Sequence, residues 1–188
     1  MTMRLWTPLA SLAAFAAATF SIPATADLAV GARAPAFAAQ GALAGKDFTF
    51  DLKKALKKGP VVLYFYPKAF TKGCTLEAHA FAEATPDFAK AGATVIGMSA
   101  DDVPTLKRFS TEACRDKFAV AAATPEVIKA YQVALKSPDG KAMPFTSRTS
   151  YVIGRDGKVA MVHSNMDWKY HVRLTLEAVQ KLQLKRRG

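Results

Sequence analysis

The sequence predicts an α/β protein built on a mixed central sheet. Two apolar runs rich in β-branched and aromatic residues, Val61–Tyr66 and Thr94–Ser99, are typical of strands buried on both faces. A helical pattern follows each run, and this strand–helix alternation predicts parallel pairing with right-handed crossovers. Thr149–Ile153 and Val159–His163 flank a glycine-rich turn, which predicts an antiparallel hairpin. We therefore expect a sheet that is parallel in the middle, closed by a hairpin, with helices on both faces.

Weaker patterns define the remaining elements. Residues 27–36 read as an extended lead-in that Gly31 and Pro35 interrupt. The other expected elements, in chain order, are a hairpin of Phe37–Gln40 with Phe48–Phe50, a short helix over Leu52–Lys58, a helix after the Asp101-Asp102 cap with Val103, Leu106 and Phe109 inside, a strand over Phe118–Ala123, a helix over Pro125–Tyr131, a turn at Ser137–Lys141, and a last helix capped by Asp167.

The N-terminus has the three parts of a secretory signal peptide. Arg4 precedes an apolar stretch, Leu9–Phe20, and Ala24-Thr25-Ala26 supplies a small-residue cleavage site. We expect cleavage after Ala26, so that residues 1–26 are the signal and residues 27–188 form one exported domain, in the periplasm. The alternative is an uncleaved membrane anchor. No later segment is long enough to span a membrane.

The formal net charge is +11 for 188 residues. No basic motif interleaved with aromatic residues supports nucleic-acid binding, so we expect no nucleic-acid partner. In an exported protein this charge favours contact with anionic surfaces, or solubility alone. The terminal Lys185-Arg186-Arg187 is typical of a solvated helix end.

Cys74 is the candidate nucleophile. It follows the strand Val61–Tyr66 and a polar loop that begins at Pro67, and Gly73 allows tight backbone geometry just before it. A helix is expected to begin at or just before Cys74, with Pro86 dividing or restarting it. Unpaired N–H groups and the macrodipole at a helix N-terminus favour a thiolate.

Three more side chains are candidates for the same site. The Thr71 hydroxyl could turn toward the sulfur or a bound substrate. Arg148, just before the hairpin strand, could stabilise a thiolate and donate paired hydrogen bonds to a small oxygen-bearing ligand. Glu77, one turn after Cys74, could orient that guanidinium. The three histidines, His79, His163 and His171, show no metal-ligand spacing, so no metal site is predicted.

The segment Pro67–Cys74, reading PKAFTKGC, resembles the P-x-x-x-T-x-x-C motif of peroxiredoxins. The following TLEA is similar to the bacterioferritin-comigratory (Q-type), AhpC/TSA-like subfamily, and the likeness continues through GMSADD and TSRTSYVIGRDGKV. The chain is identified as a member of this family, an exported bacterial one. The resemblance implies a thioredoxin-like three-layer sandwich over residues 27–188.

The resemblance also implies a role for each candidate residue. Cys74 would be the peroxidatic cysteine that attacks hydrogen peroxide or an organic hydroperoxide and becomes a sulfenic acid. Thr71 and Arg148 would bind the peroxide, Pro67 would shield the pocket, and Glu77 would orient Arg148. No metal or organic cofactor is implied. A thioredoxin-like protein or a small thiol would regenerate the enzyme, which we expect to be a monomer or weak dimer.

The sequence departs from this subfamily where many members carry a resolving cysteine, because His79 occupies that position. Cys114 is the remaining thiol, in a charged segment expected to be mobile, and the resemblance implies a redox-active Cys74–Cys114 disulfide. The alternative is a one-cysteine enzyme with an incidental Cys114. Two other functions stay open: an exported thiol–disulfide oxidoreductase, although no C-x-x-C is present, and a non-catalytic thioredoxin-fold binding module.

Overall fold

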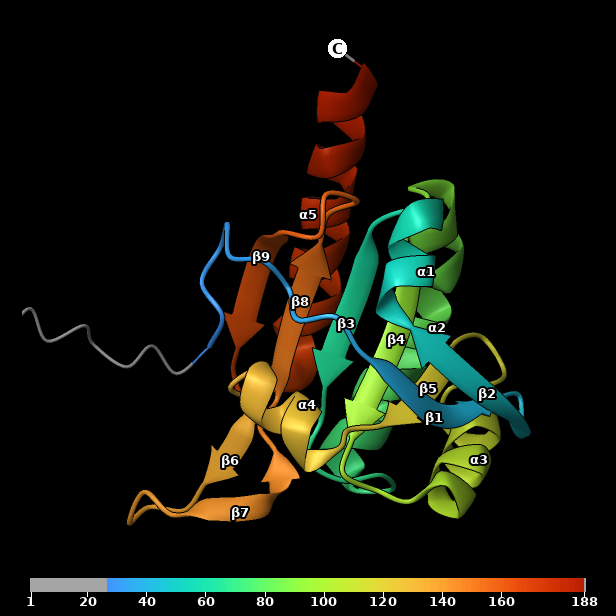
Figure 1. The fold of residues 1–188 in the computed structure, drawn as a ribbon. Helices are drawn as coiled ribbons and strands as arrows, with labels where there is room; N and C mark the ends of the chain where they lie inside the picture. Colours follow the sequence, from blue (N-terminus) through green and yellow to red (C-terminus); the bar gives the residue numbers. More distant parts are fainter. Residues whose placement is uncertain (1–26, 188) are drawn as a thin grey trace, which may run out of the picture.

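The computed structural model describes residues 27–187, so the expected signal peptide lies outside the described residues. Figure 1 shows a central sheet with helices in front of it and behind it. Seven strands form this sheet in the order β2-β1-β5-β4-β3-β8-β9, and β6 and β7 form a separate two-stranded sheet. The strands are β1 (Ala38–Leu43), β2 (Lys46–Asp51), β3 (Val61–Phe65), β4 (Thr94–Ser99), β5 (Ala119–Ala122), β6 (Ala134–Lys136), β7 (Ala142–Thr146), β8 (Thr149–Ile153) and β9 (Val159–Ser164). The helices are α1 (Leu52–Lys58), α2 (Lys72–Lys90), α3 (Val103–Glu112), α4 (Pro125–Ala130), the 3-10 turn η1 (Trp168–Tyr170) and α5 (His171–Arg187).

The predicted mixed sheet is confirmed. Strands β3, β4 and β5 pair in parallel, and the β8–β9 hairpin joins β3 in the antiparallel sense. The N-terminal hairpin β1–β2 is also present, and β1 adds to the other edge of the sheet by pairing antiparallel with β5. The parallel centre therefore carries an antiparallel hairpin on each side.

Each face of the sheet has its own apolar core. Side chains of α2, α3 and α5 pack on one face with Tyr64 and Tyr66, and side chains of α1 and α4 pack on the other with Leu63 and Phe65. Alternate residues of a strand point to opposite faces, which is why consecutive residues of β3 serve both cores. All five residues of β3 are fully buried, as its uniformly apolar sequence predicts.

Acidic residues hold the helix starts and one loop. Asp51 accepts a hydrogen bond from Lys54 N at the start of α1, and Asp102 accepts one from Thr105 N at the start of α3. Asp101 is not part of that cap. Its carboxylate accepts from Ala69 N at 2.7 Å and from Ser99 Oγ at 2.8 Å, so it fastens the loop after β3 to the end of β4.

Two expectations were wrong and one element was not foreseen. Pro86 does not divide the helix, because α2 continues through it to Lys90. Phe81 and Phe88, on either side of the proline, are both fully buried, and their packing offsets the lost backbone hydrogen bond. Asp167 caps η1 by accepting from Lys169 N, rather than capping α5 directly. The strands β6 and β7 flank the predicted turn at Ser137–Lys141 but carry no strong strand pattern.

Among residues 27–187, no helix combines the length and the apolar character needed to cross a membrane.

Replacing Pro86 with alanine should stabilise the protein. The exposed ring removes one N–H from the interior of α2, and alanine restores that donor to the carbonyl of Ala82. We expect the free energy of unfolding to rise by about 1–3 kcal/mol, measured by urea denaturation. Pro104→Ala is the matched control: Pro104 is also exposed but lies in the first turn of α3, so no gain is expected there.

Candidate active site

Cys74 lies in the first turn of α2, where the chain leaves the carboxyl end of β3. Its side chain is 1% exposed. Thr71 is the N-cap residue, and its carbonyl accepts the first helical hydrogen bond, from Thr75 N at 2.9 Å. Cys74 therefore lies at the end of α2 where backbone N–H groups lack helical partners and the macrodipole is positive, as the sequence predicted.

The Arg148 guanidinium contacts the sulfur directly. Arg148 stands one residue before β8 and is 5% exposed. Its Nη2 donates to Cys74 Sγ at 3.4 Å, its Nε donates to Met166 O at 3.0 Å, and its Nη1 forms a short ion pair with Glu77 Oε2. A cation held in three directions can stabilise negative charge on sulfur without reorganising.

Glu77 completes this buried network from α2. It lies one turn after Cys74 and is fully buried, unlike most helix glutamates. Burial raises the pKa of Glu77 to about 8, and the neighbouring Arg148 opposes that rise. Its Oε2 accepts from Arg148, while its Oε1 has no hydrogen-bond partner within residues 27–187.

His171 was not foreseen as part of the site. Its ring is fully buried, and Nδ1 lies 3.7 Å from Glu77 Oε1. Ser150 Oγ is 2.8 Å from the same Nδ1, and Asn165 O is 2.9 Å from Nε2. These contacts join α5, β8 and the loop after β9, and no sequence motif connects the residues. Within the described part of the chain, no group of three or more His, Cys, Asp or Glu side chains could hold a metal ion.

Gly73 allows the guanidinium to approach. A Cβ atom at this position would lie 3.2 Å from Arg148 Nη2. Pro67 is half-buried, two residues after the end of β3, whereas the Thr71 hydroxyl donates to Lys68 O at 3.0 Å and not to the sulfur. The structure thus brings Cys74, Arg148 and Glu77 together, with Gly73 beside them and Thr71 at the rim.

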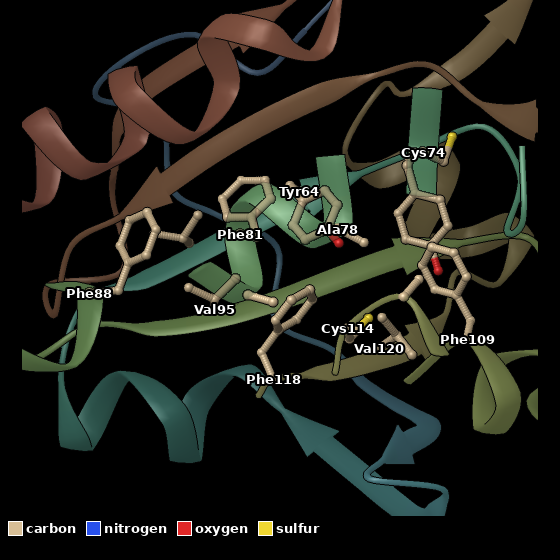
Figure 2. Close-up of a cluster of buried hydrophobic side chains, with 14 of the residues drawn as sticks. Tyr64, Cys74, Ala78, Phe81, Phe88, Val95, Phe109, Cys114, Phe118 and Val120 are labelled. Atoms are coloured by element: carbon tan, nitrogen blue, oxygen red, sulfur yellow. The ribbon is translucent and has the colours of Figure 1, made fainter. Parts of the chain in front are cut away.

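Cys114 lies in the core and not on a mobile surface segment. It follows α3, is fully buried, and its N–H bonds to Phe109 O at 3.0 Å. Figure 2 shows its side chain within the aromatic cluster near Phe118 and Val120, apart from Cys74. Both cysteines are free thiols in this structure, and burial raises the pKa of Cys114 well above its usual range.

The residues just after Cys114 have a costly backbone conformation. Arg115 and Asp116 have φ values of 50° and 60°, in the left-handed region that non-glycine residues seldom adopt. Arg115 is exposed and forms an ion pair with Glu83 of α2 at 3.2 Å. This exposed pair contributes little, because solvent screens it. Backbone hydrogen bonds from Asp116 N to Ser110 O and from Lys117 N to Cys114 O, each 3.0 Å, hold the segment in this conformation.

Comparison with known proteins defines the class. Residues 30–162 match the model of the AhpC/TSA family. Chloroplastic peroxiredoxin Q from Suaeda salsa is 35% identical over 127 residues, which cover 67% of this chain and 58% of that protein. Among solved structures, peroxidoxin BcpB from Mycobacterium tuberculosis is similar with a TM-score of 0.70 and 31% identity, over 81% of this chain and 96% of that one. Peroxiredoxin Q from Xanthomonas campestris has a TM-score of 0.67 and 26% identity, over 77% and 90% of the two chains.

The fold is thioredoxin-like, and a buried cysteine, arginine and glutamate meet at the N-terminus of α2. The chain belongs to the AhpC/TSA family, and its relatives include proteins named peroxiredoxin Q. It spans about 58–60% of the length of the plant relatives it matches.

Gly73→Ala should slow the chemistry of Cys74 without weakening the fold. The new methyl group must displace Arg148 Nη2, which Glu77 and Met166 O hold in place. Losing part of a hydrogen bond to a charged group should lower the rate of alkylation by iodoacetamide at neutral pH about three- to tenfold. Alanine is the better helix former, which offsets the cost of moving Nη2 by a few tenths of an ångström, so the free energy of unfolding should stay within about 1 kcal/mol of the wild type. An unchanged alkylation rate would show that the guanidinium contact does not activate the sulfur.

Proposed function

We propose that this protein is a thiol-dependent peroxidase with Cys74 as its peroxidatic cysteine. The observation that carries the proposal is the 3.4 Å contact from Arg148 Nη2 to Cys74 Sγ at a helix N-terminus. Both features stabilise a thiolate, which is the reactive form of the residue. The match to the AhpC/TSA family and to proteins named peroxiredoxin supports the same chemistry.

In the first step, the thiolate attacks the terminal oxygen of a hydroperoxide. The S–O bond forms as the O–O bond breaks, so Cys74 becomes a sulfenic acid and the alkoxide or hydroxide leaves and takes up a proton. Arg148 stabilises the charge that develops on the leaving oxygen. The Thr71 hydroxyl, which donates to Lys68 O in this structure, would have to turn inward to bind the peroxide.

In the second step, Cys114 resolves the sulfenic acid. Its sulfur forms an S–S bond with Cys74 as the S–O bond breaks and water leaves, which yields an intramolecular disulfide. Cys114 must first leave the core, because both thiols are buried and separate in this structure. The left-handed conformation of Arg115 and Asp116 lowers the cost of that local unfolding, since opening releases their strain.

The substrates, reductant and location follow from the same proposal. A sulfur that is 1% exposed suits hydrogen peroxide and small organic hydroperoxides. Reduction of the disulfide needs an external dithiol, which a thioredoxin-like protein or a small thiol would supply. The signal-like residues 1–26 favour export to the periplasm as the single domain 27–188, with its own core on each face of one sheet.

The other two functions have less support. A dithiol oxidoreductase typically carries its two thiols in a C-x-x-C motif, and the sequence has none, because its two cysteines are Cys74 and Cys114. An inert binding module would not need a buried arginine and glutamate next to Cys74.

Mass spectrometry after one equivalent of hydrogen peroxide tests the cycle. We expect an intramolecular disulfide in the wild type, and sulfenic or over-oxidised Cys74 in Cys114→Ser, because the first step does not need Cys114. Cys74→Ser should consume no peroxide. The mechanism is wrong if Cys74→Ser consumes peroxide at the wild-type rate. Cys114 is not the resolving residue if Cys114→Ser keeps the wild-type turnover of peroxide and its Cys74 is not over-oxidised.

Low concentrations of urea should accelerate only the second step. Release of Cys114 exposes buried surface, so the rate of disulfide formation should rise about two- to threefold per molar urea below the unfolding transition. Stopped-flow tryptophan fluorescence can separate this phase from sulfenic acid formation. Cys114→Ser, which should show the first phase alone, is the control. A second phase that does not respond to urea would mean that Cys114 reaches Cys74 without local unfolding.

A further inference from the structure

Behind Arg148, a carboxylate oxygen and an imidazole nitrogen face each other in the core. Glu77 Oε1 accepts no hydrogen bond from any residue of 27–187, and His171 Nδ1 lies 3.7 Å from it. Both side chains are fully buried. An unpaired carboxylate oxygen in such a place is costly, so its protonation state matters for the whole site.

The contacts of His171 fix which ring nitrogen carries the hydrogen. Nε2 lies 2.9 Å from Asn165 O, and a carbonyl can only accept, so Nε2 must donate. Burial lowers the pKa of His171 to about 4, so the ring is neutral at neutral pH and Nδ1 bears a lone pair. The Ser150 hydroxyl, 2.8 Å away, donates to that lone pair.

An ionised Glu77 would therefore direct a charged oxygen toward a nitrogen lone pair. A proton on Oε1 removes this repulsion. The new O–H can donate to Nδ1 after the two atoms move about 0.8 Å closer and the Ser150 hydroxyl turns its hydrogen away, because Nδ1 has only one lone pair. Oε2 still accepts from Arg148 Nη1 in that state. Burial raises the pKa of Glu77 to about 8, in the direction that favours this proton at neutral pH.

We propose that His171 is a positioning residue that, together with Glu77, holds one proton behind Arg148 and so leaves the guanidinium charge for the Cys74 thiolate. With Glu77 ionised, the Arg148 guanidinium would face two anions in the core, the Glu77 carboxylate and the Cys74 thiolate. With Glu77 protonated, the charges of Arg148 and the thiolate cancel. This inference rests on the proposed function, since it concerns the same nucleophile. It adds a residue of α5 to the machinery of the site.

Other charged and titratable groups surround the pair on every side. They are Cys74 on α2, Arg148 just before β8, His163 on β9, Tyr64 on β3 and Asp167 before η1. The His163 ring packs edge-on against His171 at 4.6 Å between centroids, but it has no contact with Glu77 among the described interactions. His163 therefore offers a control for the loss of an imidazole next to the site.

Two substitutions of His171 separate a proton-holding role from a structural one. Asparagine keeps an acceptor near Nδ1 but loses the bond to Asn165 O, whereas glutamine can keep that bond and loses the acceptor. We expect His171→Gln to slow alkylation of Cys74 by iodoacetamide at neutral pH about tenfold, because less of the sulfur is then present as thiolate. His171→Asn and the control His163→Gln should stay close to the wild type. The opposite order, with asparagine impaired and glutamine normal, would overturn the proposal.

Infrared spectroscopy of the wild type tests the proton itself. We expect a protonated carboxyl band at neutral pH that disappears in Glu77→Gln, and a carboxylate in its place would refute the proposal even if the His171 variants fail to fold. Neither measurement uses peroxide. A protein that holds this proton but does not consume peroxide would therefore disprove the proposed function alone, and an active peroxidase with an ionised Glu77 would disprove this inference alone.

Discussion

Burial of the Arg148 charge is the constraint on which the rest of the site depends. A guanidinium that is 5% exposed needs partners in several directions, and two separate parts of the chain supply three of them. Cys74 and Glu77 come from one side of α2, and the Met166 carbonyl comes from the loop after β9. Removal of one partner of a buried ion pair typically costs about 3–5 kcal/mol. The register of β8 against β3 and the start of α2 must therefore be maintained for the arginine to remain in place.

The sequence was informative where chemistry and local structure coincide. An apolar strand, a loop and a helix start locate Cys74, and the positions of Arg148 before the hairpin strand and of Glu77 one turn along the helix make them candidates for the same site. These positions follow from short patterns, because strand burial and helix capping are local properties. The same holds for the β8–β9 hairpin, which the glycine-rich turn between its strands predicts.

The remaining parts of the site arise from tertiary packing. His171, Ser150 and Asn165 meet only because α5 lies against β8 and the loop after β9, and one of these contacts uses a backbone carbonyl. No spacing in the sequence predicts that these three residues lie in contact. Pro86 shows the converse, since its local preference for a helix break yields to the buried rings of Phe81 and Phe88. The charged residues on both sides of Cys114 likewise predict an exposed segment, although Cys114 itself is buried in the core.

Helix α3 packs against the loop that leads to Cys74 and ends just before Cys114, so a change at one cysteine can affect the surroundings of the other. Its Phe109 stacks on Tyr66 at 5.3 Å and meets Phe70 edge-on at 5.3 Å, while Arg108 lies 5.0 Å over the Phe70 ring. Phe70 belongs to the loop that carries Thr71 toward Cys74. If the end of α3 unwinds to release Cys114, the wall behind that loop loosens at the same time. In the proposed disulfide form, the loop that carries Thr71 would then lack this packing, and reduction of the disulfide would have to restore it before the next peroxide binds.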